Sequence, residues 1–106
     1  MLITTTENIA RKNIIETLGL VRGCTVQTKH IGRDIMAGLK TIIGGELRGY
    51  TELLEEAREQ ALNRLEENAK AMGADAVVNL RFTTSTITAV ASEILAFGTA
   101  VRIEDV

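Results

Sequence analysis

Cys24 and His30 are the two residues whose side chains could bind a soft or borderline metal ion. Each is the single residue of its type in a chain of 106 residues, and both lie on one face of a strand if that strand stays regular. Asp34 or Glu16 could add an oxygen ligand. A structural zinc site takes four ligands, usually several Cys and His residues at short spacing. One chain cannot supply that set, so a metal site needs these residues repeated around a symmetry axis. The alternative is that Cys24 is a small packing residue and that His30 is a surface or hydrogen-bonded residue.

Other arrangements of reactive residues are incomplete. A P-loop needs a lysine directly after its last glycine, whereas Gly44-Gly45 is followed by Glu46. A serine or cysteine nucleophile could be combined with His30 and Asp34, yet no spacing favours a hydrolytic site. Four arginines could form an anion pocket if the fold brings them together: Arg22, Arg33, Arg81 and Arg102. We therefore do not expect an enzyme.

The composition is typical of one globular domain, which we assign to residues 1–106. Hydrophobic residues make up 45% of the chain and charged residues 25%. A net charge of −2 and an aromatic content of 3% argue against nucleic-acid binding. No apolar run approaches the roughly 18 residues of a membrane span, and a single cysteine suits a reducing compartment. We expect a cytosolic protein.

One long amphipathic helix, expected from Thr51 to Met72, must position much of the chain. Its apolar stripe recurs every four residues, at Leu53, Ala57, Ala61, Leu65 and Ala69. Thr51 is the expected N-cap, and Gly73 is expected to end the helix. The acidic side chains outside the stripe are expected to face solvent.

Before this helix, the chain favours two strands and a short helix. Residues 2–6 are β-branched and suit a short strand or extended arm. Residues 14–28 suit a longer strand, which Gly19 and Gly23 should bend. Residues 31–43 have helical spacing and end at the glycine pair.

After the helix, the alternation of residues predicts two strands, centred on residues 77–83 and 93–103, joined by a long polar loop at residues 84–90. The second strand is apolar on both faces. One face carries Leu95, Phe97, Val101 and Ile103, and the other carries Ile94, Ala96, Gly98 and Ala100. A single helix covers only one face, so we expect the small-residue face to pack on the short helix and N-terminal arm or on a second subunit. Closed homo-oligomerisation would also protect exposed strand edges.

Six ordered segments identify a resemblance to the YbjQ-like family, small bacterial and archaeal proteins named for heavy-metal binding. These segments are LITTTENI, LGLVRGCTV, IGRDIMAGLKTIIGGEL, YTELLEEAREQAL, AMGADAVVNLRF and EILAFGTAV. The resemblance implies an α+β fold: a β-α-β-β subunit similar to the dodecin subunit, with a long helix on a three-stranded antiparallel sheet. It also implies a ring-forming homo-oligomer, expected to be a pentamer.

The characteristic stretches of this resemblance suggest an interfacial polar network or pocket formed by Arg22, Arg33, Asp34 and Glu46. Three functions follow, in order of preference. The first is a non-enzymatic homo-oligomer that binds a small ligand or a divalent or soft metal ion at subunit interfaces, with Cys24 and His30 as the candidate metal ligands. The second is a structural or regulatory module whose partner docks on the acidic helix face, near Glu55 and Glu59. The third is an enzyme with an Arg/Asp/Glu pocket across an interface.

Overall fold

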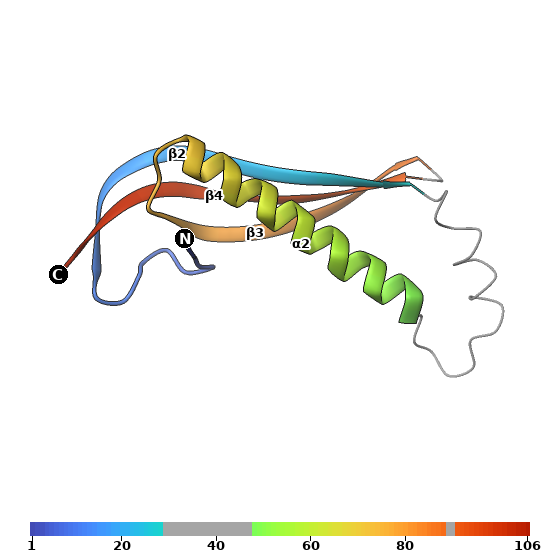
Figure 1. The fold of residues 1–106 in the computed structure, drawn as a ribbon, viewed down its shortest axis with the longest axis horizontal. Coiled ribbons are helices and arrows are strands. Elements are labelled where there is room, and N and C mark those ends of the chain that lie inside the picture. The colour runs from blue at the N-terminus through green and yellow to red at the C-terminus, as the bar shows by residue number, and fades with distance from the viewer. Residues whose placement is uncertain (29–47, 89–90) are drawn as a thin grey trace.

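A single helix packs across one face of a four-stranded sheet (Figure 1). The computed structural model describes residues 1–28, 48–88 and 91–106. Its elements are β1 (Leu2–Ile3), β2 (Lys12–Thr28), α2 (Arg48–Ala71), β3 (Ala76–Thr88) and β4 (Ala91–Asp105). The strand order is β1-β3-β4-β2. The predicted short helix at residues 31–43 lies outside the described residues.

The sheet differs in one respect from the predicted three-stranded antiparallel sheet. The three long strands are antiparallel, but β1 adds a fourth strand parallel to β3, which makes the sheet mixed. Leu2 and Ile3 pair with Ala76 and Val77. The chain after β1 stays on this edge, where the Thr4 amide donates to the Val77 carbonyl and the Leu80 amide to the Thr4 carbonyl. These backbone hydrogen bonds explain why a strand of only two residues stays attached to β3.

The predicted long helix is confirmed, with a correction at its start. It begins at Arg48, so Thr51 lies inside the helix and cannot adopt the non-helical backbone of an N-cap. Gly73 ends it as predicted, with a positive φ of 82°. The Gly73 amide donates to the Lys70 carbonyl and the Ala74 amide to the Ala69 carbonyl, the hydrogen bonds of a Schellman motif.

The core lies between α2 and the sheet. Four residues of the predicted stripe are fully buried: Ala57, Ala61, Leu65 and Ala69. They pack with sheet residues that include Val21, Val77, Ile94, Ala96 and Ala100. An added Cβ at Gly23 would overlap the backbone of Ala61 and Leu65. The alanines and Gly23 thus let the helix backbone approach the sheet closely.

The helix covers the face of β4 that we expected to need another layer. Ile94, Ala96 and Ala100 are buried beneath α2 because their small neighbours permit close approach. Leu95 and Phe97, on the opposite face of β4, are only partly buried. A second small cluster, Ala76, Val78 and Val101 with Ile9 and Ile103, covers part of that opposite face near the chain termini.

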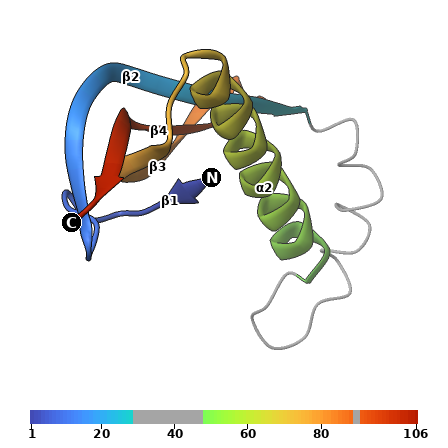
Figure 2. The ribbon, with the colours of Figure 1, turned by 60° about the vertical axis from the view of Figure 1, so that its left-hand side comes forward.

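The long strands are irregular at defined places. The pairing of β2 with β4 shifts between Ile14 and Glu16 and again between Thr17 and Gly19, where Gly19 has a φ of 118°. The predicted bend of this strand is thus confirmed, and Figure 2 shows β2 curving over the end of the sheet. Gly23 does not mark a bend and instead marks the contact with α2.

The long loop predicted between the last two strands is wrong for the described residues. β3 and β4 stay paired as far as Thr88 and Ala91, so residues 84–88 belong to β3. Thr, Ser and Ile are the residue types of this segment, and the β-branched ones favour a strand. The polarity of residues 84–88 therefore did not indicate a loop.

Candidate binding site

Arg22 and Cys24, two of the residues singled out in the sequence, lie on one face of β2. Their neighbours Val21, Gly23 and Thr25 are buried beneath α2, whereas Arg22 and Cys24 are exposed. Alternation along the strand therefore places both side chains on the side away from the helix. We call this side of the sheet the far face; Leu20, Arg22, Cys24 and Val26 of β2 and Glu93, Leu95 and Phe97 of β4 form it.

A pocket of about 550 Å³ surrounds the outer edge of β2 at this point. The far face contributes the side chains of β2 and β4, and α2 contributes polar side chains from the other side of the edge. The lining residues are Arg22, Gly23, Cys24, Arg64, Glu67, Asn68, Glu93 and Leu95. The structure thus brings Arg22 and Cys24 together, with partners that the sequence did not indicate.

Two hydrogen bonds fix the helix side of the pocket to the strand edge. Arg64 Nη1 donates to the Cys24 carbonyl at 2.6 Å, and Asn68 Nδ2 donates to the Arg22 carbonyl at 2.7 Å. The spacings match, because four helix residues rise about 6 Å and two strand residues about 6.6 Å. These bonds also occupy edge carbonyls that would otherwise be open to another strand.

The buried hydroxyl of Thr25 supports the same helix–strand contact about two turns earlier on the helix. Thr25 is 2% exposed, and its Oγ1 donates to the Ala57 carbonyl at 3.4 Å. Among the described residues, no buried side-chain nitrogen or oxygen lacks a hydrogen-bond partner. The pocket therefore rests on a helix–strand contact whose polar groups are satisfied.

The charges of the pocket balance. Arg22 and Arg64 supply two positive charges, and Glu67 and Glu93 supply two negative ones. The ion pairs formed within the described residues involve other groups, such as Lys12 with Asp105 and Lys70 with Glu66. Among the described residues, none of these four charged side chains forms an ion pair.

The metal prediction finds little support in the part of the chain that the structure describes. No group of three or more His, Cys, Asp and Glu side chains there could hold a metal ion. Cys24 is exposed, and no other Cys and no His is among the described residues that line the pocket. His30, Arg33, Asp34 and Glu46 lie outside the described residues, so their predicted roles stay predictions.

The helix residues of the pocket have a weak signal in the sequence. Arg64 and Asn68 are four residues apart, and each directly precedes a residue of the buried stripe, Leu65 or Ala69. That spacing places them along one flank of the stripe, where they can reach a neighbouring strand. The sequence does not say which strand that is.

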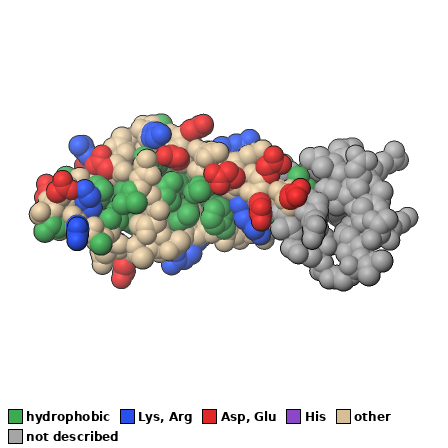
Figure 3. Space-filling model, turned by 60° about the horizontal axis from the view of Figure 1, so that its bottom comes forward, with side chains coloured by type: hydrophobic (Ala, Val, Ile, Leu, Met, Phe, Trp, Pro, Cys, Tyr) green, Lys and Arg blue, Asp and Glu red, His purple; other side chains and the backbone are tan. Residues whose placement is uncertain are grey.

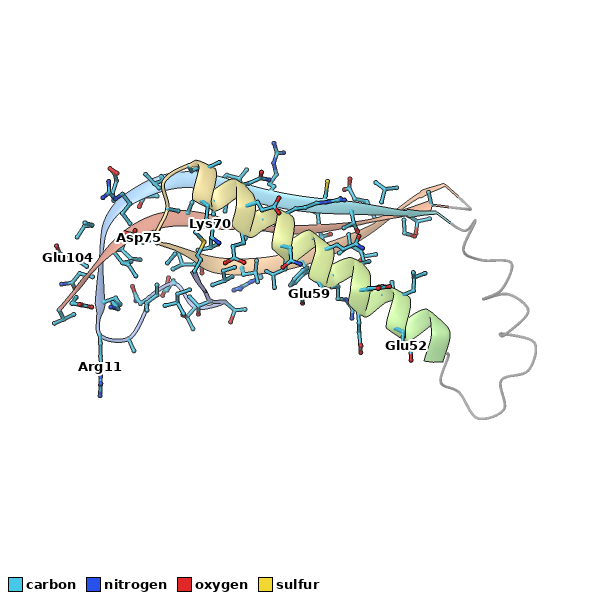
Figure 4. All side chains as sticks on the ribbon, viewed as in Figure 1. Arg11, Glu52, Glu59, Lys70, Asp75 and Glu104 are labelled. Atoms are coloured by element: carbon cyan, nitrogen blue, oxygen red, sulfur yellow. The ribbon has the colours of Figure 1, made fainter. Side chains whose placement is uncertain are left out.

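Charged residues elsewhere are spread over the surface. Figure 4 shows Arg11 and Glu104 at the end of the sheet where β2 begins, and Glu52 at the opposite end, near the start of α2. Glu55 and Glu59, the proposed docking residues, are exposed on the helix. No described helix is long and apolar enough to cross a membrane.

These features define a small α+β domain with a charged pocket at a sheet edge. A crystal structure of a protein of unknown function from Pediococcus pentosaceus, assigned to the DUF74 family, has the same fold, with a TM-score of 0.66 over 98% of both chains. Its sequence is 16% identical, so the likeness concerns the fold alone.

Sequence comparison gives the family. The YbjQ family model, described as "Putative heavy-metal-binding", matches residues 1–104, and the chain belongs to this family. A UPF0145 protein from Photobacterium profundum is 65% identical over 97% of this chain and 100% of its own length. Another, from Methanosarcina acetivorans, is 60% identical over 97% of both chains. The resemblance seen in the sequence is thus confirmed.

Proposed function

We propose that this protein is a non-enzymatic homo-oligomer, a ring of five subunits, that binds a small ligand where subunits meet. The observation that carries this proposal is the exposed far face of the sheet. Leu20 and Val26 are 63% and 51% exposed there, beside the partly buried Leu95 and Phe97. Full burial of one such side chain contributes about 1.5–3 kcal/mol, so a second layer on this face would be favourable.

The shape of the molecule supports the same proposal. Its radius of gyration is 17.2 Å and its dimensions are 55 × 26 × 16 Å. A compact chain of this length has a radius of gyration of about 13 Å. Figure 3, which brings the β3 side of the molecule forward and not the far face, shows hydrophobic side chains at the surface between charged side chains of both signs. A second copy is the occupant that we propose for the far face.

The ligand site follows from the position of the pocket. Arg22, Cys24, Glu93 and Leu95 belong both to the pocket and to the far face. A subunit packed on that face would therefore border the pocket. We favour a small molecule over a metal ion, because the described residues of one chain supply no metal cluster. The proposed location is the cytosol, where the single cysteine would stay reduced.

The test compares the mass of the wild-type protein with that of Leu20→Glu by light scattering after gel filtration. A buried glutamate at a subunit contact would be costly, so the variant should dissociate while remaining folded by circular dichroism. Val106→Glu is the control, because Val106 is 86% exposed at the chain end. A wild-type protein that is monomeric at all concentrations would overturn the proposal.

A further inference from the structure

The pocket at the edge of β2 has two guanidinium groups that can receive an anion. Arg64 uses one N–H to bind the Cys24 carbonyl, which holds the side chain against the strand edge. Its guanidinium group has five N–H donors, so others remain for a ligand. Arg22 lies two residues from Cys24 on the same face of β2. A carboxylate is one of the anions that a guanidinium group binds through two parallel hydrogen bonds.

Two carboxylates line the same pocket. Glu67 is on α2 between Arg64 and Asn68, the two residues that bind the strand edge. Glu93 is on β4, where it pairs with Val26 and thus neighbours Cys24 diagonally. Their charges would repel an anion that lacks a positive group, and they would attract an ammonium group.

The remaining wall and the size restrict the ligand further. Leu95 pairs directly with Cys24 and gives the pocket an apolar surface. The volume of about 550 Å³ lies within the range of roughly 300–1,000 Å³ that is usual for small-molecule sites. A ligand with both charges and a short apolar part would match every wall.

From these groups we infer that the pocket binds a small zwitterion of the α-amino-acid type. Arg22 and Arg64 receive its carboxylate, Glu67 and Glu93 receive its ammonium group, and Leu95 contacts its side chain. This inference rests on the proposed function, because it names the class of ligand bound by the assembly. It does not require a metal ion.

The test uses Cys24, the single cysteine of the chain, as a reporter inside the pocket. The rate of its alkylation by the neutral reagent iodoacetamide is measured with L-leucine as the probe. N-acetyl-L-leucine, which lacks the positive charge, and L-leucinamide, which lacks the negative charge, are the matched probes. Leucine should slow alkylation about tenfold at roughly ten times its Kd, and each matched probe much less.

Variants then assign the two charges. Arg22→Gln and Glu93→Gln should each remove most of the protection by leucine. The controls Arg58→Gln and Glu59→Gln change the same residue types on the exposed surface of α2, outside the pocket. They should leave the protection by leucine unchanged. Thermal melts of all four variants check that they are folded.

The inference is overturned if leucine gives neither protection nor heat of binding by calorimetry, or if either matched probe binds equally well. Calorimetry is the deciding measurement if Cys24 does not react in the ligand-free protein. Light scattering of the same samples separates the two proposals. An oligomer that does not bind leucine contradicts only the zwitterion site. A monomer that binds leucine contradicts only the proposed assembly.

Discussion

Gly23 is the residue on which the contact between β2 and α2 most depends. A Cβ at this position would overlap backbone atoms of Ala61 and Leu65, which cannot rotate away as a side chain could. We predict that Gly23→Ala lowers the free energy of unfolding by about 3 kcal/mol, the upper part of the usual range for overpacking. Urea denaturation measures the change.

Thr17→Ala is the control for this substitution, since Thr17 is exposed on the same strand and should change stability by less than about 0.5 kcal/mol. Equal stability of Gly23→Ala and the wild-type protein would contradict the close helix–strand contact described above.

Lys12 and Asp105 join the start of β2 to the end of β4. The hydrogen bond from Lys12, together with its positive charge, holds the pKa of Asp105 below its ordinary value of 3.8. Because the folded-state pKa is lowered, this carboxylate contributes stability above its unfolded pKa, and the contribution is lost as pH falls through the folded pKa. The pair is exposed, so its contribution is small.

We predict that Lys12→Gln raises the pKa of Asp105 toward its ordinary value. An NMR titration of the Asp105 carboxyl carbon measures it in both proteins. Lys70→Gln is a charge-matched control at a distant ion pair with Glu66. An unchanged pKa of Asp105 in Lys12→Gln would show that Lys12 is not the cause of the shift.

At the scale of elements, α2 is attached to the outer strand through Arg64 and Asn68. Arg64→Ala removes the hydrogen bond to the Cys24 carbonyl, and hydrogen bonds from charged groups contribute about 1.5–3 kcal/mol, with exposed ones at or below the lower end. We predict a loss of about 1 kcal/mol in stability and faster amide exchange in the segment around Cys24. Hydrogen-exchange mass spectrometry measures the second effect.

Arg58→Ala is the matched control, since Arg58 is exposed on the same helix. If both variants exchange alike around Cys24, the Arg64 side chain does not stabilise the edge of β2.

The elements that could be predicted from the sequence are those with strong local signals. The alanine and leucine stripe of α2, the stop at Gly73 and the bend of β2 near Gly19 depend on neighbouring residues. The short strand or arm predicted at residues 2–6 contains β1, but its parallel pairing with β3 could not be predicted, because the partner Ala76 lies far along the chain. The polarity of residues 84–88 also outweighed their β-branched character in the prediction.

The candidate site was predictable only in part, for a similar reason. Arg22 and Cys24 were predicted as site residues from the chemistry of their side chains, and strand alternation places them on one face. Arg64 and Asn68 meet β2 because α2 crosses the sheet diagonally over that strand, as Figure 1 shows. The crossing angle depends on the packing of small residues such as Gly23 and Ala61, which no local pattern encodes.

At the scale of the whole molecule, one helix and one sheet leave the far face open among the described residues. Leu20 and Val26 are exposed there beside a pocket that carries two positive and two negative charges. Burial of this face by a second copy and occupation of the pocket by a small zwitterion would use the same region.

Native mass spectrometry of the protein purified without a chelator tests the central claim most directly, with elemental analysis of the same sample. We predict an assembly of about 57 kDa, five times the 11.5 kDa of the chain, with a fixed number of small organic ligands and no stoichiometric metal. Arg22→Gln should keep the assembly and lose the ligand. A monomer of 11.5 kDa, with or without ligand, would contradict the account.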